Sequence, residues 1–455
     1  MNLLKIDQAA LKHTFQPFMQ RHTIYTVSLI FISLISLIEL KAQNAYFVSV
    51  NNSQFTIGRA PYYYIGVNYW YGSLLTLQKD GSRGKERLKK ELDFLKSQGV
   101  NNLRVLAGSE GKGLVNGVER VKPTLQPEHG EFNPAILEGL DYLIYEMGKR
   151  KMYAVLFLSN NWEWSGGFLQ YLNWNKVISD SAMRSKMNWD DLRDNTSGFY
   201  SCDPCKKDYE KQLKLILNHF NKYTKRAYKN EPAIMAWELA NEPRPMRPAA
   251  IDAYKEWTSS VASLIKSIDK NHLVTLGTEG IMGTEESAKL FQEVHQPKDI
   301  DYLTLHIWPK NWGWFRDTSI TESLPVIISK SKDYIRKHEA IAKALNKPLV
   351  IEEFGLPRDG HSFDPAATTF ARDSYFKAVF DEWNRSRNSH GVIAGCNFWS
   401  FGGTARPVKG QVFWKEGDDF MGDPPQEEQG LNTVFDCDNT TWTLVRSYTN
   451  PNSTR

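Results

Sequence analysis

The chain has 455 residues, of which 41% are hydrophobic and 13% aromatic, enough to bury the core of a barrel domain of about 250 residues or more. Its formal charge at pH 7 is only +4, and no long run of lysine or arginine occurs. A polyanionic partner such as a nucleic acid is therefore not expected.

The N-terminal segment differs from the rest of the chain. Residues 1–22 are polar and basic, and residues 23–38 form an apolar run. That run is shorter than the roughly 20 residues that a membrane-spanning helix needs, and small or polar residues follow it. We expect residues 1–43 to be a signal peptide, and the protein to be secreted, extracellular or periplasmic, without stable membrane association after processing. An uncleaved membrane anchor is the alternative.

From residue 62 onward, short apolar runs alternate with segments of helical periodicity. The strand-like runs cover residues 62–72, 100–108, 153–162, 233–243, 272–280, 301–309, 348–355 and 391–403. Helices are expected over residues 83–99, 133–151, 209–231, 249–268, 324–346 and 367–388. This order is typical of a (β/α)₈ barrel in a single catalytic domain, residues 44–455. The alternative is a doubly wound open sheet, which is disfavoured because no nucleotide-binding glycine motif follows any of the runs.

Four cysteines remain outside the N-terminal segment. Cys202 and Cys205 lie in a loop-like stretch, and we favour a small local disulfide between them. A structural zinc would need two more ligands of suitable spacing, and neither Cys396 nor Cys437 repeats the pair. Cys396 lies within an apolar run and is read as a buried small side chain.

Polar and aromatic residues gather at the ends of the predicted strands. In a barrel of this type the active site lies at the carboxyl ends of the strands. The residues at these ends are Asn68, Tyr69, Trp70, Arg104, Asn160, Asn161, Trp162, Asn241, Glu242, His306, Trp308, Glu352, Glu353 and Trp399. A barrel with a purely structural role would not need them there.

Two carboxylates at the ends of the fourth and seventh runs suggest cleavage of a glycosidic bond. One carboxyl, Glu242, would protonate the leaving oxygen while the other, Glu353, attacks the anomeric carbon. Arg104 near the nucleophile would keep it anionic, and apolar neighbours would keep the acid protonated. Asn241 could donate to a sugar hydroxyl, and His306 and Trp308 share one side of their strand and are expected to face the site.

Glu352 and Glu353 are adjacent, and neighbouring strand residues point to opposite sides. The position of Glu353 at the end of the run favours it as the residue facing the site. Glu352 is then expected to contact neighbouring helices or loops.

Many tryptophans also lie at strand ends and in loops, where the flat faces of sugar rings could stack on them. These residues are Trp70, Trp162, Trp164, Trp174, Trp308, Trp312, Trp314, Trp399 and Trp414. Each one alone is more simply explained by packing. Together they suit an extended polysaccharide in an open cleft.

The motifs WELANEPR (237–244), HIWPKNWGWF (306–315), VIEEFG (350–355) and FWSFGG (398–403) resemble those of glycoside hydrolase family 5, and in particular its endo-β-1,4-mannanases. The resemblance covers residues 62–448 and implies a retaining endo-mannanase with no metal or other cofactor, acting as a monomer on β-mannan, galactomannan or glucomannan. The alternatives are a β-1,4-glucanase of the same family and a barrel that binds polysaccharide without catalysis.

Carried over to this sequence, the resemblance implies specific roles at the site. Glu242 is the acid/base and Glu353 the nucleophile, supported by Arg104, Asn241 and His306. The substrate-binding residues are Trp70, Asn161, Trp162, Arg244, Trp308 and Trp399.

Two positions depart from the family pattern. Trp308 stands where many relatives have a tyrosine that hydrogen-bonds the nucleophile, and Asn160 and Asn161 stand where many have histidine. Both departures put the hydrogen-bond network around the carboxylates in doubt.

Overall fold

The computed structural model describes residues 47–77 and 81–450. The predicted signal peptide, residues 1–43, lies outside the described residues, as does its boundary with the catalytic domain. From Val48 onward the chain forms one compact unit. None of the helices in the described part combines the length and the apolar character that crossing a bilayer requires.

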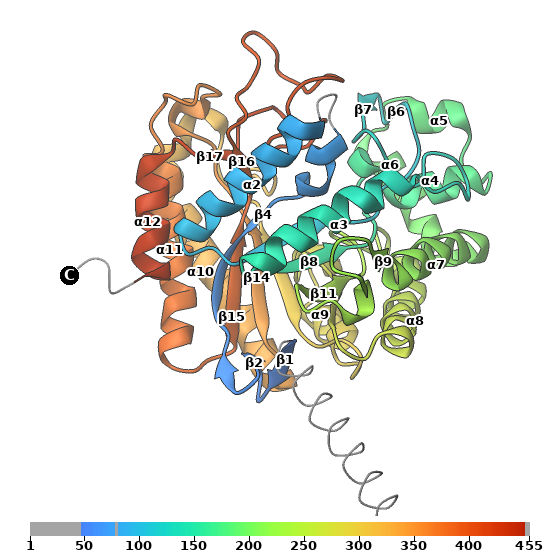
Figure 1. Ribbon diagram of the computed structural model, residues 1–455, viewed down its shortest axis with the longest axis horizontal. Helices are drawn as coiled ribbons and strands as arrows, with labels where there is room; N and C mark the ends of the chain where they lie inside the picture. The colour runs from blue at the N-terminus through green and yellow to red at the C-terminus, as the bar shows by residue number, and fades with distance from the viewer. Residues whose placement is uncertain (1–46, 78–80, 451–455) are drawn as a thin grey trace, which may run out of the picture. The chain divides into compact units, whose positions relative to one another are not determined.

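Eight parallel strands form the central sheet (Figure 1). They are β4 (Tyr64–Asn68), β5 (Asn102–Leu106), β8 (Tyr153–Phe157), β11 (Ile234–Glu238), β12 (Leu273–Thr275), β13 (Leu303–Ile307), β14 (Leu349–Phe354) and β15 (Ile393–Phe398). Their order is β12-β11-β8-β5-β4-β15-β14-β13. The two end strands of this order are bridged by backbone hydrogen bonds from Asp301 to Val274 (2.8 Å) and from His306 to Glu279 (3.1 Å). The predicted (β/α)₈ barrel is therefore confirmed, and the open sheet is excluded.

Helices cover the outside of the barrel (Figure 1). They are α2 (Gly81–Ser97), α3 (Pro134–Lys149), α7 (Asp203–Asn218), α8 (Ile251–Ile268), α9 (Ala288–His295), α10 (Ile320–Leu345), α11 (Phe370–Asn388) and α12 (Asn439–Thr449). The leucine stripe of α2, Leu88, Leu92 and Leu95, is fully buried against the barrel, as its helical spacing predicts. Helix α3 begins with a proline in its first turn and a capping Asn133, both typical of helix N-termini.

One predicted helix is much shorter than expected. Helix α7 ends at Asn218, whereas the periodicity predicted a helix to residue 231. The chain continues as a short hairpin, β9 (Phe220–Asn221) and β10 (Arg226–Ala227). The side chain of Asn221 accepts hydrogen bonds from the backbone of Tyr223 and Thr224, a local turn that competes with the helix.

A small sheet lies at the amino-terminal ends of the barrel strands. It consists of β1 (Val48–Asn51), β2 (Gln54–Ile57) and β3 (Ala60–Pro61). Phe55 of this sheet packs edge-on against Tyr302, with ring centroids 5.2 Å apart, and both belong to the apolar cluster inside the barrel. This end of the barrel is thus filled, so the opposite end is the one that can hold a site.

Two long segments lie at the carboxyl ends of the barrel strands. Residues 161–206 are an insertion rich in Trp and Asn that contains α4 (Gly167–Trp174), α5 (Asp180–Arg184) and α6 (Trp189–Ser197). Within this insertion a disulfide joins Cys202 to Cys205, as predicted. The last loop, residues 404–433, runs between the short strands β16 (Phe401–Gly403) and β17 (Val434–Phe435). These strands and loop lie at the top of the view in Figure 1.

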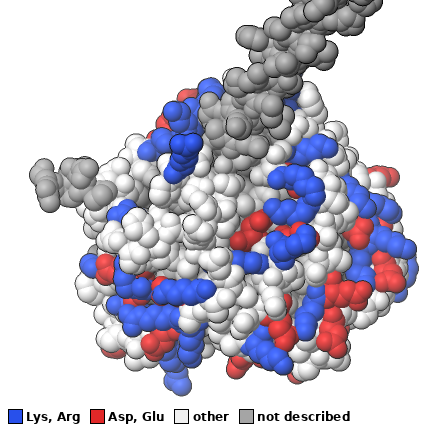
Figure 2. Space-filling view, turned by 90° about the horizontal axis from the view of Figure 1, so that it is seen from below, with Lys and Arg blue, Asp and Glu red and all other residues white. Residues whose placement is uncertain are grey.

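The remaining short elements lie in connecting loops. They are β6 (Leu114–Val115), β7 (Val118–Glu119), and the 3₁₀ turns η1 (Gly72–Leu77), η2 (Glu163–Ser165), η3 (Gly198–Ser201), η4 (Tyr228–Asn230), η5 (Pro248–Ala250), η6 (Met282–Thr284), η7 (Asp317–Ser319) and η8 (Asp359–His361). On the face shown in Figure 2, basic and acidic side chains are intermixed, which agrees with the small net charge.

Candidate active site

Strands β11 and β14 bring Glu242 and Glu353 together at the carboxyl end of the barrel. Glu353 lies within β14 and pairs in register with His306 of the neighbouring β13. Glu242 follows β11 and is fixed by a 2.8 Å hydrogen bond from its backbone N–H to the carbonyl of Gly277. Its φ angle of 51° lies in the left-handed region, which residues other than glycine adopt rarely and often at functional sites.

The two carboxylates are close to each other and nearly enclosed. Glu242 is 6% exposed and Glu353 is 3% exposed. One oxygen of each carboxylate and one ring nitrogen of His306 all lie within 4.8 Å of one another. His306 Nδ1 lies 2.6 Å from Glu242 Oε1 and 3.4 Å from Glu353 Oε2, so the imidazole stands between the pair.

Each carboxylate has its own hydrogen-bond donors. The indole N–H of Trp162 donates to Glu242 Oε2. Glu353 Oε1 accepts from Arg104, and Glu353 Oε2 accepts from the indole N–H of Trp308 at 3.0 Å. Trp308 thus supplies the donor that a tyrosine supplies in the family pattern, which resolves the doubt that this departure raised.

Arg104 of β5 is the centre of the network beneath the pair. Its five N–H groups make five hydrogen bonds: two to Glu238, and one each to Asn241 Oδ1 (2.7 Å), Asn68 Oδ1 (3.0 Å) and Glu353. An arginine has five N–H donors in all, so every one is used. Because the guanidinium is fully buried, it places a fixed positive charge next to Glu353.

The pKa values of the pair follow from this environment. Burial raises the pKa of both Glu242 and Glu353, and each carboxylate disfavours the charge of the other. The charge of Arg104 opposes that rise at Glu353, which it contacts, and the charge of Arg244 opposes it at Glu242. Burial lowers the pKa of His306 to about 4, so the imidazole is neutral near pH 7.

The expectation for Glu352 is wrong. Its carboxyl points into the barrel, with Oε2 3.5 Å from His306 Nε2 and 3.8 Å from Arg104 Nε, rather than toward helices or loops. The pairing of β13 with β14 shifts here, because Leu305 pairs with Ile351 and His306 with Glu353, leaving Glu352 as an extra residue. A bulge of this kind breaks the alternation of side chains, so both glutamates face inward.

Asn241 and Asn160 form a hydrogen-bonded pair next to Glu242. Asn241 donates from Nδ2 to Asn160 Oδ1 at 3.1 Å while its own Oδ1 accepts from Arg104. Asn160 Oδ1 also accepts from the backbone N–H of Trp162 at 2.9 Å. The asparagines therefore orient the segment that carries the indole donor to Glu242.

Besides Glu238, which binds Arg104, sequence reasoning missed two carboxylates at this end of the barrel. Glu279 follows β12 and forms an ion pair with Arg244, whose guanidinium also lies 5.1 Å from the ring centre of Trp162. Burial raises the pKa of Glu279 to about 7. Glu427 of the last loop is near enough to Glu242 for the charge of each to disfavour that of the other. The fifth run ends in Thr-Glu-Gly, a signal that could have revealed Glu279, whereas nothing near Glu427 in the sequence marks it.

The predicted aromatic contacts divide into exposed and buried residues. Trp162 and Trp308 are partly exposed and lie beside the carboxylates. Trp399 is 3% exposed and its ring meets that of Trp308 edge-on, with centroids 5.9 Å apart. Contact of these three side chains with substrate stays a prediction.

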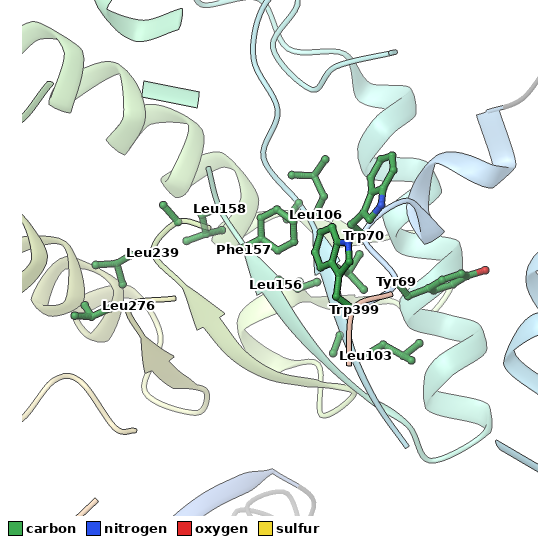
Figure 3. Close-up of a cluster of buried hydrophobic side chains, with 14 of the residues drawn as sticks. Tyr69, Trp70, Leu103, Leu106, Leu156, Phe157, Leu158, Leu239, Leu276 and Trp399 are labelled. Carbon is green, nitrogen blue, oxygen red and sulfur yellow. The ribbon is translucent and has the colours of Figure 1, made fainter. Parts of the chain in front are cut away.

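Trp70 and Asn161 are fully buried, unlike Trp162 and Trp308. Both side chains have no exposed surface, and the indole N–H of Trp70 donates to the backbone carbonyl of Gly422 at 2.7 Å. Figure 3 shows Trp70 among apolar side chains such as Leu106. The last loop thus covers Trp70 from outside, and contact of these two residues with substrate stays a prediction.

The cluster of Glu242, His306 and Glu353 has the spacing of a metal site, and it is the only such group among the described residues. However, Arg104 donates to Glu353, and the indole of Trp162 donates to Glu242. A cation here would be repelled by the buried guanidinium of Arg104. It would also compete with both donors for the carboxylate oxygens. The donor set therefore fits a pair of catalytic carboxylates better than a metal centre.

Comparisons with known proteins agree with this geometry. Residues 45–453 match the family model described as GH family 5 beta-mannosidase-like. Two mannan endo-1,4-beta-mannosidases of Arabidopsis thaliana, numbers 1 and 7, are 28% and 29% identical over 78% of this chain, and the matches cover 81% and 77% of those proteins. A crystal structure of a glycoside hydrolase family 5 mannosidase from Rhizomucor miehei is 30% identical, with a TM-score of 0.79 over 89% of this chain and 97% of that chain. On this evidence the chain belongs to the β-mannosidase-like group of glycoside hydrolase family 5.

Proposed function

We propose that this protein hydrolyses β-1,4-mannosidic bonds with retention of configuration, with Glu353 as nucleophile and Glu242 as acid/base. The observation that carries the mechanism is the separation of the carboxylates, with oxygens within 4.8 Å of each other. Retaining enzymes hold these groups about 5–5.5 Å apart, whereas inverting enzymes leave about 6.5–9.5 Å for a water. The distance therefore supports a covalent intermediate.

The two steps use the same pair of carboxylates. In the first step an oxygen of Glu353 bonds to the anomeric carbon while Glu242 gives its proton to the leaving glycosidic oxygen. In the second step a water gives a proton to Glu242, and the water oxygen displaces Glu353 from the anomeric carbon. Arg104 and Trp308, which both donate to Glu353, stabilise its charge before attack and as it leaves.

Mannan as substrate is supported by the curated relatives, which are named as mannan endo-1,4-beta-mannosidases. We propose internal cleavage of mannan, galactomannan or glucomannan by a secreted, monomeric enzyme. Release of single mannose units is a second candidate, because the family model is described as beta-mannosidase-like and the Rhizomucor miehei protein is named a mannosidase. The products from mannohexaose distinguish the two, since internal cleavage gives mannobiose and mannotriose early and terminal cleavage gives mannose.

The nucleophile is tested by Glu353→Ala, which should abolish hydrolysis while leaving binding of mannan and the fold intact. Glu322→Ala, an exposed glutamate on α10, is the matched control and should retain full activity. A 2-fluoro-mannosyl inhibitor should label Glu353, as read by mass spectrometry of peptides. Near-normal activity of Glu353→Ala, or labelling at another residue, would refute the assignment.

Stereochemistry and substrate class need separate assays. The first sugar anomer released, followed by NMR, should be β, and an α product would mean inversion. A panel of galactomannan, glucomannan, carboxymethylcellulose and xylan should show highest activity on the mannans. Preference for carboxymethylcellulose would instead favour the β-1,4-glucanase alternative.

A further inference from the structure

Glu352 is a buried carboxyl that the proposed reaction does not use. It is 1% exposed, and the bulge in β14 turns it inward beneath Glu353. Glu352 Oε2 and His306 Nε2 face each other at 3.5 Å, and each atom lacks any closer hydrogen-bond partner among the described residues. These two buried polar atoms are closer to each other than to any other partner, which indicates a functional pairing, because an unpaired buried polar group is costly.

The groups around Glu352 come from several strands of the barrel. Burial, and after it the charge of Glu238 of β11, raise the pKa of Glu352, while Arg104 of β5, 3.8 Å from its Oε2, lowers it. The hydroxyl groups of Tyr64 and Tyr302 lie on the amino-terminal side and are near enough for the charge of Glu352 to disfavour their ionisation. Arg104 already uses all five N–H groups elsewhere, and burial holds the pKa of Tyr64 and Tyr302 well above its usual value. His306 is therefore the neighbour left to exchange a proton with Glu352.

The imidazole of His306 connects Glu352 to Glu242. Its Nδ1 lies 2.6 Å from Glu242 Oε1, and its Nε2 faces Glu352. A neutral imidazole has one N–H and one lone pair, so the state of one neighbour fixes the state of the other. If Nε2–H donates to an ionised Glu352, Nδ1 offers its lone pair to a protonated Glu242.

The opposite arrangement is also complete. A protonated Glu352 donates its O–H to Nε2, and Nδ1–H donates to an ionised Glu242. The two arrangements interconvert when the O–H bond of Glu242 and the Nε2–H bond break while the Nδ1–H bond and the O–H bond of Glu352 form. The number of protons stays constant, and one negative charge moves between the two carboxyls.

We propose that Glu352 is a positioning residue that sets the protonation of Glu242 by sharing one proton with it through His306. This inference rests on the proposed role of Glu242 as acid/base. In the working form, Glu352 is ionised and holds His306 with its hydrogen on Nε2, so that Glu242 keeps the proton that the leaving oxygen needs. Glu352 itself touches neither substrate nor the reacting atoms.

The decisive variant is Glu352→Gln, which keeps the shape but cannot ionise. The pH dependence of kcat/KM on mannohexaose reports the ionisation of the free enzyme, and its basic limb reports Glu242. Removing the negative charge of Glu352 should lower the pKa of Glu242, so the basic limb should move down by about one pH unit. A purely structural role would lower the melting temperature or kcat and leave the limb in place.

A double variant distinguishes proton sharing through His306 from a direct electrostatic effect of Glu352 on Glu242. In a His306→Gln background, adding Glu352→Gln should leave the basic limb unmoved, because the connection is already broken. An unmoved limb in the single variant, or an equal shift in both backgrounds, would overturn the proposal.

A measurement on the unmodified protein does not depend on folding of any variant or on activity. Nitrogen-15 NMR of the histidines near pH 6 should show His306 neutral with its hydrogen on Nε2, and a hydrogen on Nδ1 would overturn the proposal. Failure of the proposed function, seen as an active Glu353→Ala variant, would leave this tautomer result unchanged, so the two failures can be told apart.

Discussion

Arg104 offers the sharpest test of how the site is held together. Lysine at this position would keep the positive charge but has three N–H donors instead of five. At least two of the acceptors on Glu238, Asn241, Asn68 and Glu353 would then lose their partner. Each buried acceptor left unpaired costs about 1–3 kcal/mol, so Arg104→Lys should lower the free energy of unfolding by about 2–6 kcal/mol.

Activity should fall as well, because the geometry around Glu353 depends on the planar guanidinium. The loss of one charge-assisted hydrogen bond, about 1.5–3 kcal/mol, corresponds to a fall in kcat/KM of about 10- to 100-fold. Urea unfolding followed by tryptophan fluorescence, together with kcat/KM on mannohexaose, measures both quantities. Arg372→Lys is the matched control, because Arg372 is equally buried but binds Asp438 far from the carboxylates, so it should lose stability and keep activity. An Arg104→Lys variant with unchanged unfolding and unchanged kcat/KM would refute the reasoning.

Three further outcomes follow from other parts of the molecule. Asp438→Ala removes the shared partner of the fully buried Arg358 and Arg372, and urea unfolding should show a loss of about 3–5 kcal/mol. Burial lowers the pKa of His338 to about 4, so the folded state stays neutral while the unfolded chain takes up a proton below pH 6.5. The free energy of unfolding should therefore decrease as pH falls from 6.5 to 4. In the His338→Gln variant, urea titrations should show this pH dependence reduced by about 1.4 kcal/mol per pH unit. Trp189 is 51% exposed and stacks on Trp162 with ring centroids 6.1 Å apart, so Trp189→Ala should lower kcat/KM on mannohexaose about 3- to 10-fold and leave an aryl mannoside unaffected.

The strands and the carboxylate pair could be predicted because they depend on local signals. A parallel strand buried on both faces is a continuous apolar run, and the carboxyl ends of all such strands meet at one end of a barrel. Glu242 and Glu353 could therefore be placed together without knowing how the helices pack. The end of α7 was harder, because the turn made by Asn221 outweighs the helical periodicity that continues past it.

The orientation of Glu352 could not be predicted, because it depends on the pairing of two strands. Alternation holds only while each residue has one partner, and the shift between Leu305 and His306 gives β14 one residue more than β13. The burial of Trp70 could not be predicted either, since the residues that cover it, such as Gly422, lie some 350 positions away in the chain. Such contacts belong to the tertiary structure and leave no pattern near either residue.

The division of the site between strands and loops determines how substitutions should act. Arg104, His306 and Glu353 lie on strands, are almost fully buried, and make bonds that also hold the barrel together. Changes to them should reduce kcat and stability together. Trp162 and Trp189 lie on the insertion, and each keeps part of its ring exposed; Trp162 donates to Glu242, whereas Trp189 stacks on Trp162. Changes to Trp189 should therefore affect KM for long substrates and spare stability, so the barrel can keep one chemistry while its loops adapt to the length and branching of the polysaccharide.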